Sequence, residues 1–81
     1  MSAVDYCTLL LEGACATAPS GTFTVPYANM GACTSAYTPL SDTVKMCRSY
    51  HLCNALGTNT EANRTLHCPH SVGMGGQCAA N

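Results

Sequence analysis

The chain has 81 residues, enough for one small domain covering 1–81 and for no second core. Three basic and four acidic residues, in no run of either sign, argue against nucleic acid and anionic membrane surfaces as partners. No stretch approaches the roughly 20 apolar residues of a membrane span, so no transmembrane segment is expected. The first residues lack the basic start and apolar run of a secretory signal, as in a mature chain.

Large apolar residues, which build a protein core, are scarce in this sequence. There are seven Leu, four Val, one Phe and no Ile, and a domain of this size buries only about 60 % of its unfolded surface. The seven cysteines are therefore the expected source of stability, because one disulfide contributes about 2–4 kcal/mol. Such a cysteine content in a short chain is typical of oxidising compartments, so we expect an extracellular protein.

The first part of the chain is predicted to hold one helix, then extended chain and loop. Residues 4–18 carry leucines on one side, which favours a helix that Pro19 stops. Residues 22–27 alternate apolar and polar side chains as a strand does, but a proline limits them to a short extended piece. Residues 29–39 are rich in Gly, Ala, Ser and Thr and are predicted to form a loop around Cys33.

The clearest helix signal begins at Ser41, a good N-cap with Asp42 in the first turn, and ends at Gly57. Two stripes of side chains at helical spacing predict a helix that is buried on more than one side. The first stripe is Leu40, Val44, Cys47, His51 and Ala55, and the second is Met46, Tyr50 and Cys53.

A short third helix is predicted over residues 58–67, with Asn59 or Thr60 as its cap. The glycine-rich tail, residues 71–81, is predicted to be irregular and tethered by Cys78. The expected fold is therefore mainly α: a small disulfide-stapled helical domain with irregular loops and one short β-like segment.

The spacing of the cysteines excludes several kinds of site. The chain has no C-x-x-C motif and no adjacent cysteine pair, which argues against zinc ribbons and thioredoxin-like redox sites. Cys47 and Cys53 lie six steps apart on the predicted helix, about 120° around its axis and about 9 Å along it. A disulfide needs Cα atoms within about 7 Å. These two cysteines are therefore not expected to pair with each other, and each is expected to form a disulfide with a different segment of the chain.

The run TVKMCRSYHLCNAL, whose second cysteine is separated by fourteen residues from the cysteine of LHCPHSV, resembles the central block of the elicitins and elicitin-like proteins of oomycetes. Cys47, Cys53, Asn54 and Cys68 match the order of that family's block. The resemblance implies a set of three disulfides that leaves Cys15 out: Cys7–Cys68, Cys33–Cys53 and Cys47–Cys78. It also implies a secreted, non-catalytic protein that binds a sterol or another apolar ligand or is sensed by a host. The residues expected to line such a site are Leu9, Leu10, Val44, Met46, Tyr50 and Leu56.

Other sites are expected to be absent, apart from one glycosylation motif. His67, Cys68, His70 and Met74 resemble the ligand loop of blue-copper proteins, but the helical context contradicts that fold. We therefore expect a disulfide cysteine flanked by surface histidines, without a metal or other cofactor. The carboxylates form no recognisable pair, so no enzyme is expected. Asn63 begins an N-x-T sequon, which predicts a glycan at the surface of a secreted protein.

An alternative function is that of a structural subunit in an extracellular or surface fibre or coat. An odd number of cysteines in a secreted chain suggests a bridge between molecules. Cys15 is expected to be that unpaired or intermolecular cysteine, with self-association as the result. The thin core and low charge fit a protein that is stabilised by neighbouring copies.

Overall fold

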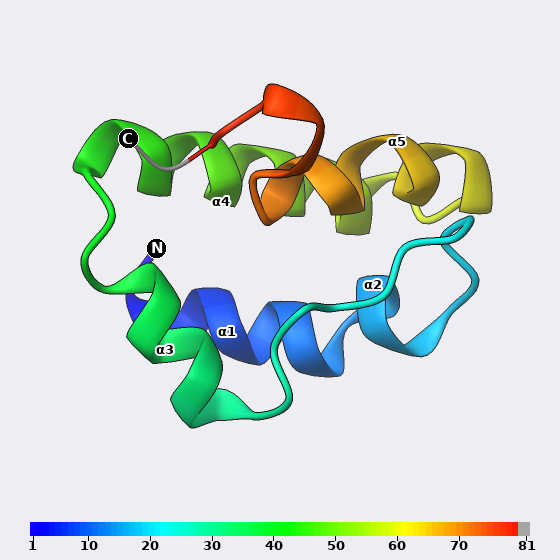
Figure 1. Cartoon of the computed structure of the whole chain (residues 1–81). Helices are drawn as coiled ribbons and strands as arrows, with labels where there is room; N and C mark the ends of the chain where they lie inside the picture. Colours follow the sequence, from blue (N-terminus) through cyan, green and yellow to red (C-terminus); the bar gives the residue numbers. More distant parts are fainter. Residues whose placement is uncertain (80–81) are drawn as a thin grey trace.

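The computed structural model describes residues 1–79, which fold into two layers of helices (Figure 1). The lower layer in Figure 1 holds α1 (Ala3–Glu12), α2 (Ala14–Thr17) and α3 (Met30–Tyr37). The upper layer holds α4 (Asp42–Gly57) and α5 (Glu61–Ser71), and the short 3₁₀ helix η1 (Met74–Gly76) follows in the tail. The mainly α, disulfide-stapled fold expected from the sequence is confirmed.

The helix predicted over residues 4–18 is broken into α1 and α2 at Gly13. A Cβ atom at Gly13 would lie 2.4 Å from the carbonyl oxygen of Leu9 and 3.2 Å from Leu56 Cδ2. The glycine therefore permits a close approach between the end of α1 and the side chain of Leu56 on α4. The extended piece predicted at residues 22–27 forms no strand within the described part of the chain, where a single bridge pairs Ser20 with Thr22.

The prediction of a loop over residues 29–39 is wrong, because most of this segment is helix α3. Its N-cap is Asn29, whose Oδ1 accepts a hydrogen bond of 2.9 Å from the backbone N–H of Ala32. The helix has no marked apolar stripe in sequence; its buried residues are Cys33 and Tyr37, and Met30 packs partly buried against the core. Tertiary contacts thus hold a helix that sequence periodicity does not reveal.

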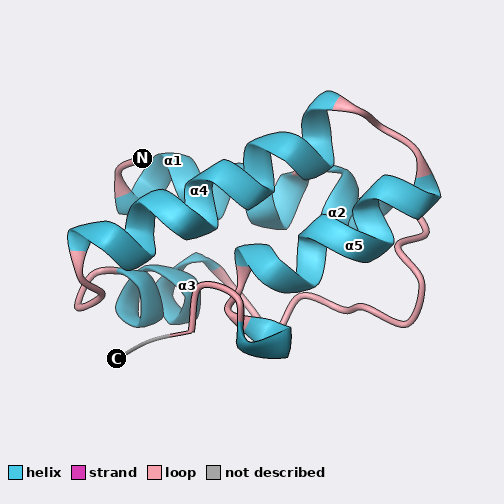
Figure 2. Ribbon diagram, turned by 90° about the horizontal axis from the view of Figure 1, so that it is seen from above, coloured by secondary structure: helices cyan, strands magenta, loops and turns pink. Residues whose placement is uncertain are grey.

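The two predicted helices of the upper layer are confirmed. Ser41 caps α4, its hydroxyl accepting from the backbone N–H of Val44 at 3.2 Å, and the helix ends at Gly57 as expected. Thr60 caps α5 in the same way, and α5 continues past His67 and through Pro69 to Ser71. The two helices are joined by only three residues and lie antiparallel, side by side, as Figure 2 shows.

Tyrosines and cystines fill the core where large aliphatic residues are few. Tyr6 of α1 and Tyr37 of α3 stack with ring centroids 4.3 Å apart. Burial raises the pKa of the Tyr6 phenol far above its usual range, and its O–H donates to the carbonyl oxygen of Ser71 on α5. The other residues in this core include Leu10, Leu52, Ala55, Val72 and the buried cysteines 7, 15, 33 and 68.

Three disulfides join these elements, and only one of them matches the pairing that the elicitin resemblance implied. Cys47 of α4 pairs with Cys78 of the tail, as implied. The implied pairs Cys7–Cys68 and Cys33–Cys53 are wrong. Because α3 packs against α1, Cys33 meets Cys7 at a Cα distance of 5.9 Å.

The remaining disulfide corrects the assignment of the odd cysteine. Cys15 is buried in α2 and pairs with Cys68 of α5, with the two Cα atoms 5.7 Å apart. Cys15 is therefore neither unpaired nor intermolecular within this fold. The free thiol among the described residues is Cys53, which is exposed on α4. The expectation that Cys47 and Cys53 both clamp other segments holds for Cys47 alone.

Candidate metal centre

The α4–α5 hairpin brings together the three histidines of the chain. His51 lies in the middle of α4, whereas His67 and His70 lie three residues apart on α5 and so share one face of that helix. The antiparallel packing of the hairpin sets this face against His51. One ring nitrogen from each histidine lies within 4.8 Å of the others, and all three side chains are half-buried. We call these three residues the histidine cluster.

The distance between two nitrogens of the histidine cluster matches the separation of two ligands in a metal site. His51 Nδ1 and His67 Nδ1 are 3.2 Å apart. Zinc with Zn–N bonds of about 2.0–2.1 Å and tetrahedral geometry places two nitrogen ligands about 3.3–3.4 Å apart. In the metal-free protein one of these two nitrogens must carry a proton to donate to the other. A metal ion replaces that proton and can use both nitrogens as ligands.

The third histidine, His70, is placed to complete the set of ligands. Its ring lies 5.1 Å from that of His51 and 6.4 Å from that of His67, between ring centroids. His70 Nδ1 is buried and has no hydrogen-bond partner among the described residues. A buried nitrogen without a partner costs free energy. A metal ligated by this ring would fix its tautomer and orientation, and would give its nitrogens defined roles.

The surroundings of the histidine cluster favour the neutral form of His51, which is the form that binds a metal cation. Burial lowers the pKa of His51 below its usual value of 6.5, and the neighbouring rings of His70 and His67 lower it further. Histidine binds metals in its neutral form. At neutral pH protons therefore compete only weakly with a metal ion for the ring nitrogens of His51.

The same pKa shift predicts how the stability of the metal-free protein depends on pH. In the unfolded chain His51 titrates near pH 6.5, whereas in the folded protein its pKa is lower. Below about pH 6.5 the unfolded state therefore binds more protons, and stability is lost as pH falls toward the folded pKa. The groups around His51 are Tyr50 on its own helix and His67 and His70 on α5.

Urea unfolding of chelator-treated protein between pH 5.0 and 7.5 measures this effect. We expect the midpoint to be level at the alkaline end and to decrease below about pH 6.5. In the variant His51→Gln the part of this decrease that comes from His51 is lost. A midpoint that rises on acidification would contradict the assignment.

The six residues expected to line an apolar ligand site differ widely in exposure. Leu10 and Val44 are buried, whereas Met46 and Tyr50 are 71 % and 66 % exposed. A hollow of about 410 Å³ is lined by Met1, Asp5, Thr8 and Leu9, so only Leu9 of the six belongs to it. The lining set therefore stays a prediction, whereas the expectation that the stripe Met46, Tyr50 and Cys53 is buried is wrong.

The residue expected to carry a glycan, Asn63, uses its side-chain amide inside the fold. Its Nδ2 donates to the backbone oxygen of Asn54 at 2.6 Å and to that of Thr58 at 2.9 Å. Asn63 thereby joins the first turn of α5 to the end of α4. A glycan on Nδ2 would remove one of its two N–H groups, so both hydrogen bonds could not persist.

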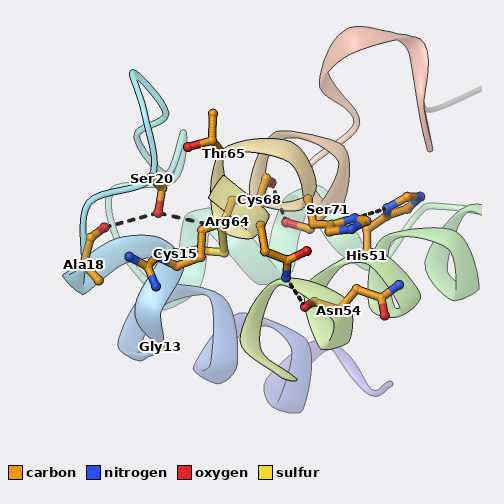
Figure 3. Close-up of a disulfide and its surroundings, with 12 residues drawn as sticks. Gly13, Cys15, Ala18, Ser20, His51, Asn54, Arg64, Thr65, Cys68 and Ser71 are labelled. Carbon is orange, nitrogen blue, oxygen red and sulfur yellow. Dashed lines mark hydrogen bonds between the residues drawn. A yellow bond between two sulfur atoms is a disulfide. The ribbon is translucent and has the colours of Figure 1, made fainter. Parts of the chain in front are cut away.

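The disulfide expected at Cys68 removes it from any set of metal ligands. Figure 3 shows the Cys15–Cys68 bridge between α2 and α5, with Arg64 and Ser20 beside it and His51 further along the hairpin. A blue-copper-like site that uses Cys68 as a ligand is thereby excluded. The spacing of residues along the chain does not reveal that the two histidines flanking Cys68 converge on His51, sixteen positions before His67.

Fold and site together define a small disulfide-stapled helical domain with a histidine cluster between its two longest helices. Searches against protein-family models, curated proteins and solved structures found no match to this chain. Within residues 1–79 no helix has both the length and the apolar character to cross a membrane. Three disulfides fit an extracellular protein.

Proposed function

We propose that this protein is secreted and binds a divalent transition metal, with zinc as the best fit, through His51, His67 and His70. The observation that carries the proposal is the convergence of all three histidines of the chain, with one ring nitrogen of each within 4.8 Å of the others. Imidazole ligands suit zinc, copper and nickel. Three protein ligands leave a fourth position of tetrahedral zinc for water or an outside ligand.

The role that fits this site is metal binding rather than catalysis. The groups of potential ligands among the described residues contain histidine and cysteine only. The four carboxylates of the chain are all exposed, so none is held beside the cluster as a general base for a metal-bound water. Metal uptake, storage or presentation needs only the three imidazoles and access from solvent.

Calorimetric titration of metal-free, oxidised protein with zinc at pH 7.5 tests the proposal. We expect one ion per chain, and we expect His67→Ala to weaken binding by more than the roughly 10–100-fold typical of outer-shell partners, because it removes a direct ligand. Asp42→Asn, which alters an exposed carboxylate at the start of α4, is the matched control and should leave the affinity unchanged. Equal affinity in wild type and His67→Ala would show that zinc binds elsewhere.

The elicitin resemblance and the sterol-carrier role remain predictions. The Ser41-capped helix and the Cys47–Cys78 bridge support the resemblance. The carrier role lacks the expected cavity lining, since Met46 and Tyr50 point to solvent. Competition between a fluorescent and an unlabelled sterol tests it, and a folded protein that binds neither would exclude the carrier role.

A second candidate function is that of a subunit in a disulfide-linked assembly, with Cys53 in place of Cys15. Cys53 is free and exposed among residues 1–79, and it shares a face of α4 with the exposed Met46 and Tyr50. An unpaired cysteine in a secreted chain suggests a bridge to another copy. Light scattering under non-reducing conditions should find a dimer that Cys53→Ser converts to monomer. A monomer whose Cys53 stays open to alkylation would exclude this assembly.

A further inference from the structure

The Cys47–Cys78 disulfide lies directly beside the histidine cluster. Cys47 precedes His51 by four residues on α4, so both project from one face of the helix. The two sulfur atoms and a ring nitrogen of His51 all lie within 4.8 Å of one another. His51 therefore belongs to two groups of potential metal ligands, one with histidines and one with the sulfurs of this bridge.

We infer that reduction of the Cys47–Cys78 disulfide converts the three-histidine centre into a tighter zinc site made of two thiolates and two imidazoles. The ligands are Cys47, Cys78, His51 and the adjacent His67. Two cysteines and two histidines around tetrahedral zinc form a closed site, in contrast to the open position left by three histidines. The inference rests on the proposed metal binding and adds control of its affinity by redox state.

Burial makes this disulfide the one that a reductant reaches first. The four half-cystines of the other two bridges are between 0 and 2 % exposed. Cys47 is half-buried, and Cys78, in the tail rather than in a helix, is 9 % exposed. Cys78 also has a φ of 57°, a left-handed conformation that is unfavourable for a residue with a side chain. Access of this kind governs which disulfide undergoes thiol exchange.

The tail is held near the cluster by contacts that do not depend on the disulfide. Arg48 is 6 % exposed, and its Nε donates to the carbonyl oxygen of Cys78 at 2.9 Å. The same guanidinium lies against Gly73, where a Cβ would come within 2.5 Å of Arg48 Nη2. Arg48 therefore keeps Cys78 in place after reduction. Its positive charge also favours the thiolate form that zinc requires.

The chemical step is thiol–disulfide exchange with a dithiol. One sulfur of the dithiol attacks the bridge to give a mixed disulfide, and its second sulfur displaces the remaining cysteine. The S–S bond between Cys47 and Cys78 breaks and an S–S bond forms in the dithiol, which is oxidised by two electrons. The two protons of the dithiol end on the cysteines, and zinc binding releases them to solvent.

Zinc titration of the full chain before and after reduction tests the inference. A phosphine is the reductant in the test because it leaves no competing thiol; it becomes a phosphine oxide with oxygen from water. Alkylation and mass spectrometry should find three reactive thiols, from Cys47, Cys53 and Cys78, with the other four cysteines still bridged. Zinc affinity should rise at least roughly 10-fold, because thiolates are strong ligands for zinc.

Three controls separate this inference from the proposed function. Cys53→Ser should keep the gain on reduction, whereas Cys47→Ser/Cys78→Ser should bind zinc as the oxidised wild type does, with no gain. If that double variant fails to fold, alkylation of reduced wild type should abolish the gain instead. Binding only after reduction would overturn the three-histidine proposal and with it the conversion, leaving a zinc site that reduction alone creates. Oxidised binding without a gain, or loss of helical circular dichroism on reduction, would overturn the inference alone.

Discussion

Replacing both Cys15 and Cys68 by Ala is expected to reduce the free energy of unfolding by about 4 kcal/mol, and the variant should be largely unfolded at 37 °C. The bridge closes a sequence separation of 53 residues, the longest of the three disulfides. The entropy that such a link removes from the unfolded chain increases with loop length. Both half-cystines are buried, at 2 % and 0 % exposure, so alanine also leaves unfilled volume in the core.

The consequence is large because the remaining core is small. A domain typically has about 5–15 kcal/mol of stability in total, and only four of the large aliphatic residues here are buried: Leu10, Val44, Leu52 and Val72. Urea unfolding followed by circular dichroism measures the difference. Cys53→Ser, which removes an exposed free thiol, is the matched control and should stay within about 0.5 kcal/mol of wild type. A double variant as stable as that control would contradict a role for this bridge in holding the layers together.

Replacing Arg64 by Met is expected to cost roughly 2–4 kcal/mol, although the aliphatic volume is kept, because a hydrogen bond to a charged group contributes about 1.5–3 kcal/mol. Arg64 is 6 % exposed. Its Nε and Nη2 donate to the carbonyl oxygen of Pro19 at 3.0 and 2.7 Å, and its Nη1 donates to Asn59 Oδ1 at 2.6 Å. The guanidinium thereby joins α5 to the loop after α2, beside the Cys15–Cys68 bridge (Figure 3).

Two comparisons show whether this effect comes from geometry or from charge. Arg64→Lys keeps the positive charge but loses the planar fork, so we expect most of the destabilisation to remain. Lys45→Ala removes another cation, which lies 5.6 Å from the centroid of the Tyr37 ring. That change should cost at most about 2 kcal/mol, the size of a cation–π contact that is partly shielded from water. Full recovery of stability in Arg64→Lys would show that charge alone matters.

Signals that act within one segment of the chain were sufficient to predict most of the fold. Ser41 and Thr60 cap their helices because their hydroxyls accept from N–H groups three residues ahead. Gly57 ends α4 as expected. Helix α3 was missed because its small side chains carry no periodicity. Its stability comes from the Cys33 bridge to Cys7 and from the stacking of Tyr37 on Tyr6.

The candidate site depended on contacts between segments, which local signals do not contain. The sequence pattern predicts a third helix that ends at His67 and excludes His70, whereas α5 continues to Ser71 and so carries both histidines on one face. Their meeting with His51 also requires the antiparallel register of α4 and α5. The disulfide pairing failed for the same reason, because it depends on which helices pack together. Only Cys47–Cys78 agreed with the pairing implied by the elicitin resemblance.

X-ray absorption at the zinc edge, on oxidised protein with one equivalent of zinc, tests the metal centre most directly. A site formed by His51, His67 and His70 predicts three imidazole nitrogens at about 2.0–2.1 Å, one further light atom and no sulfur. Zinc surrounded by oxygen ligands alone, or by sulfur at about 2.3 Å in the oxidised protein, would contradict a three-histidine centre.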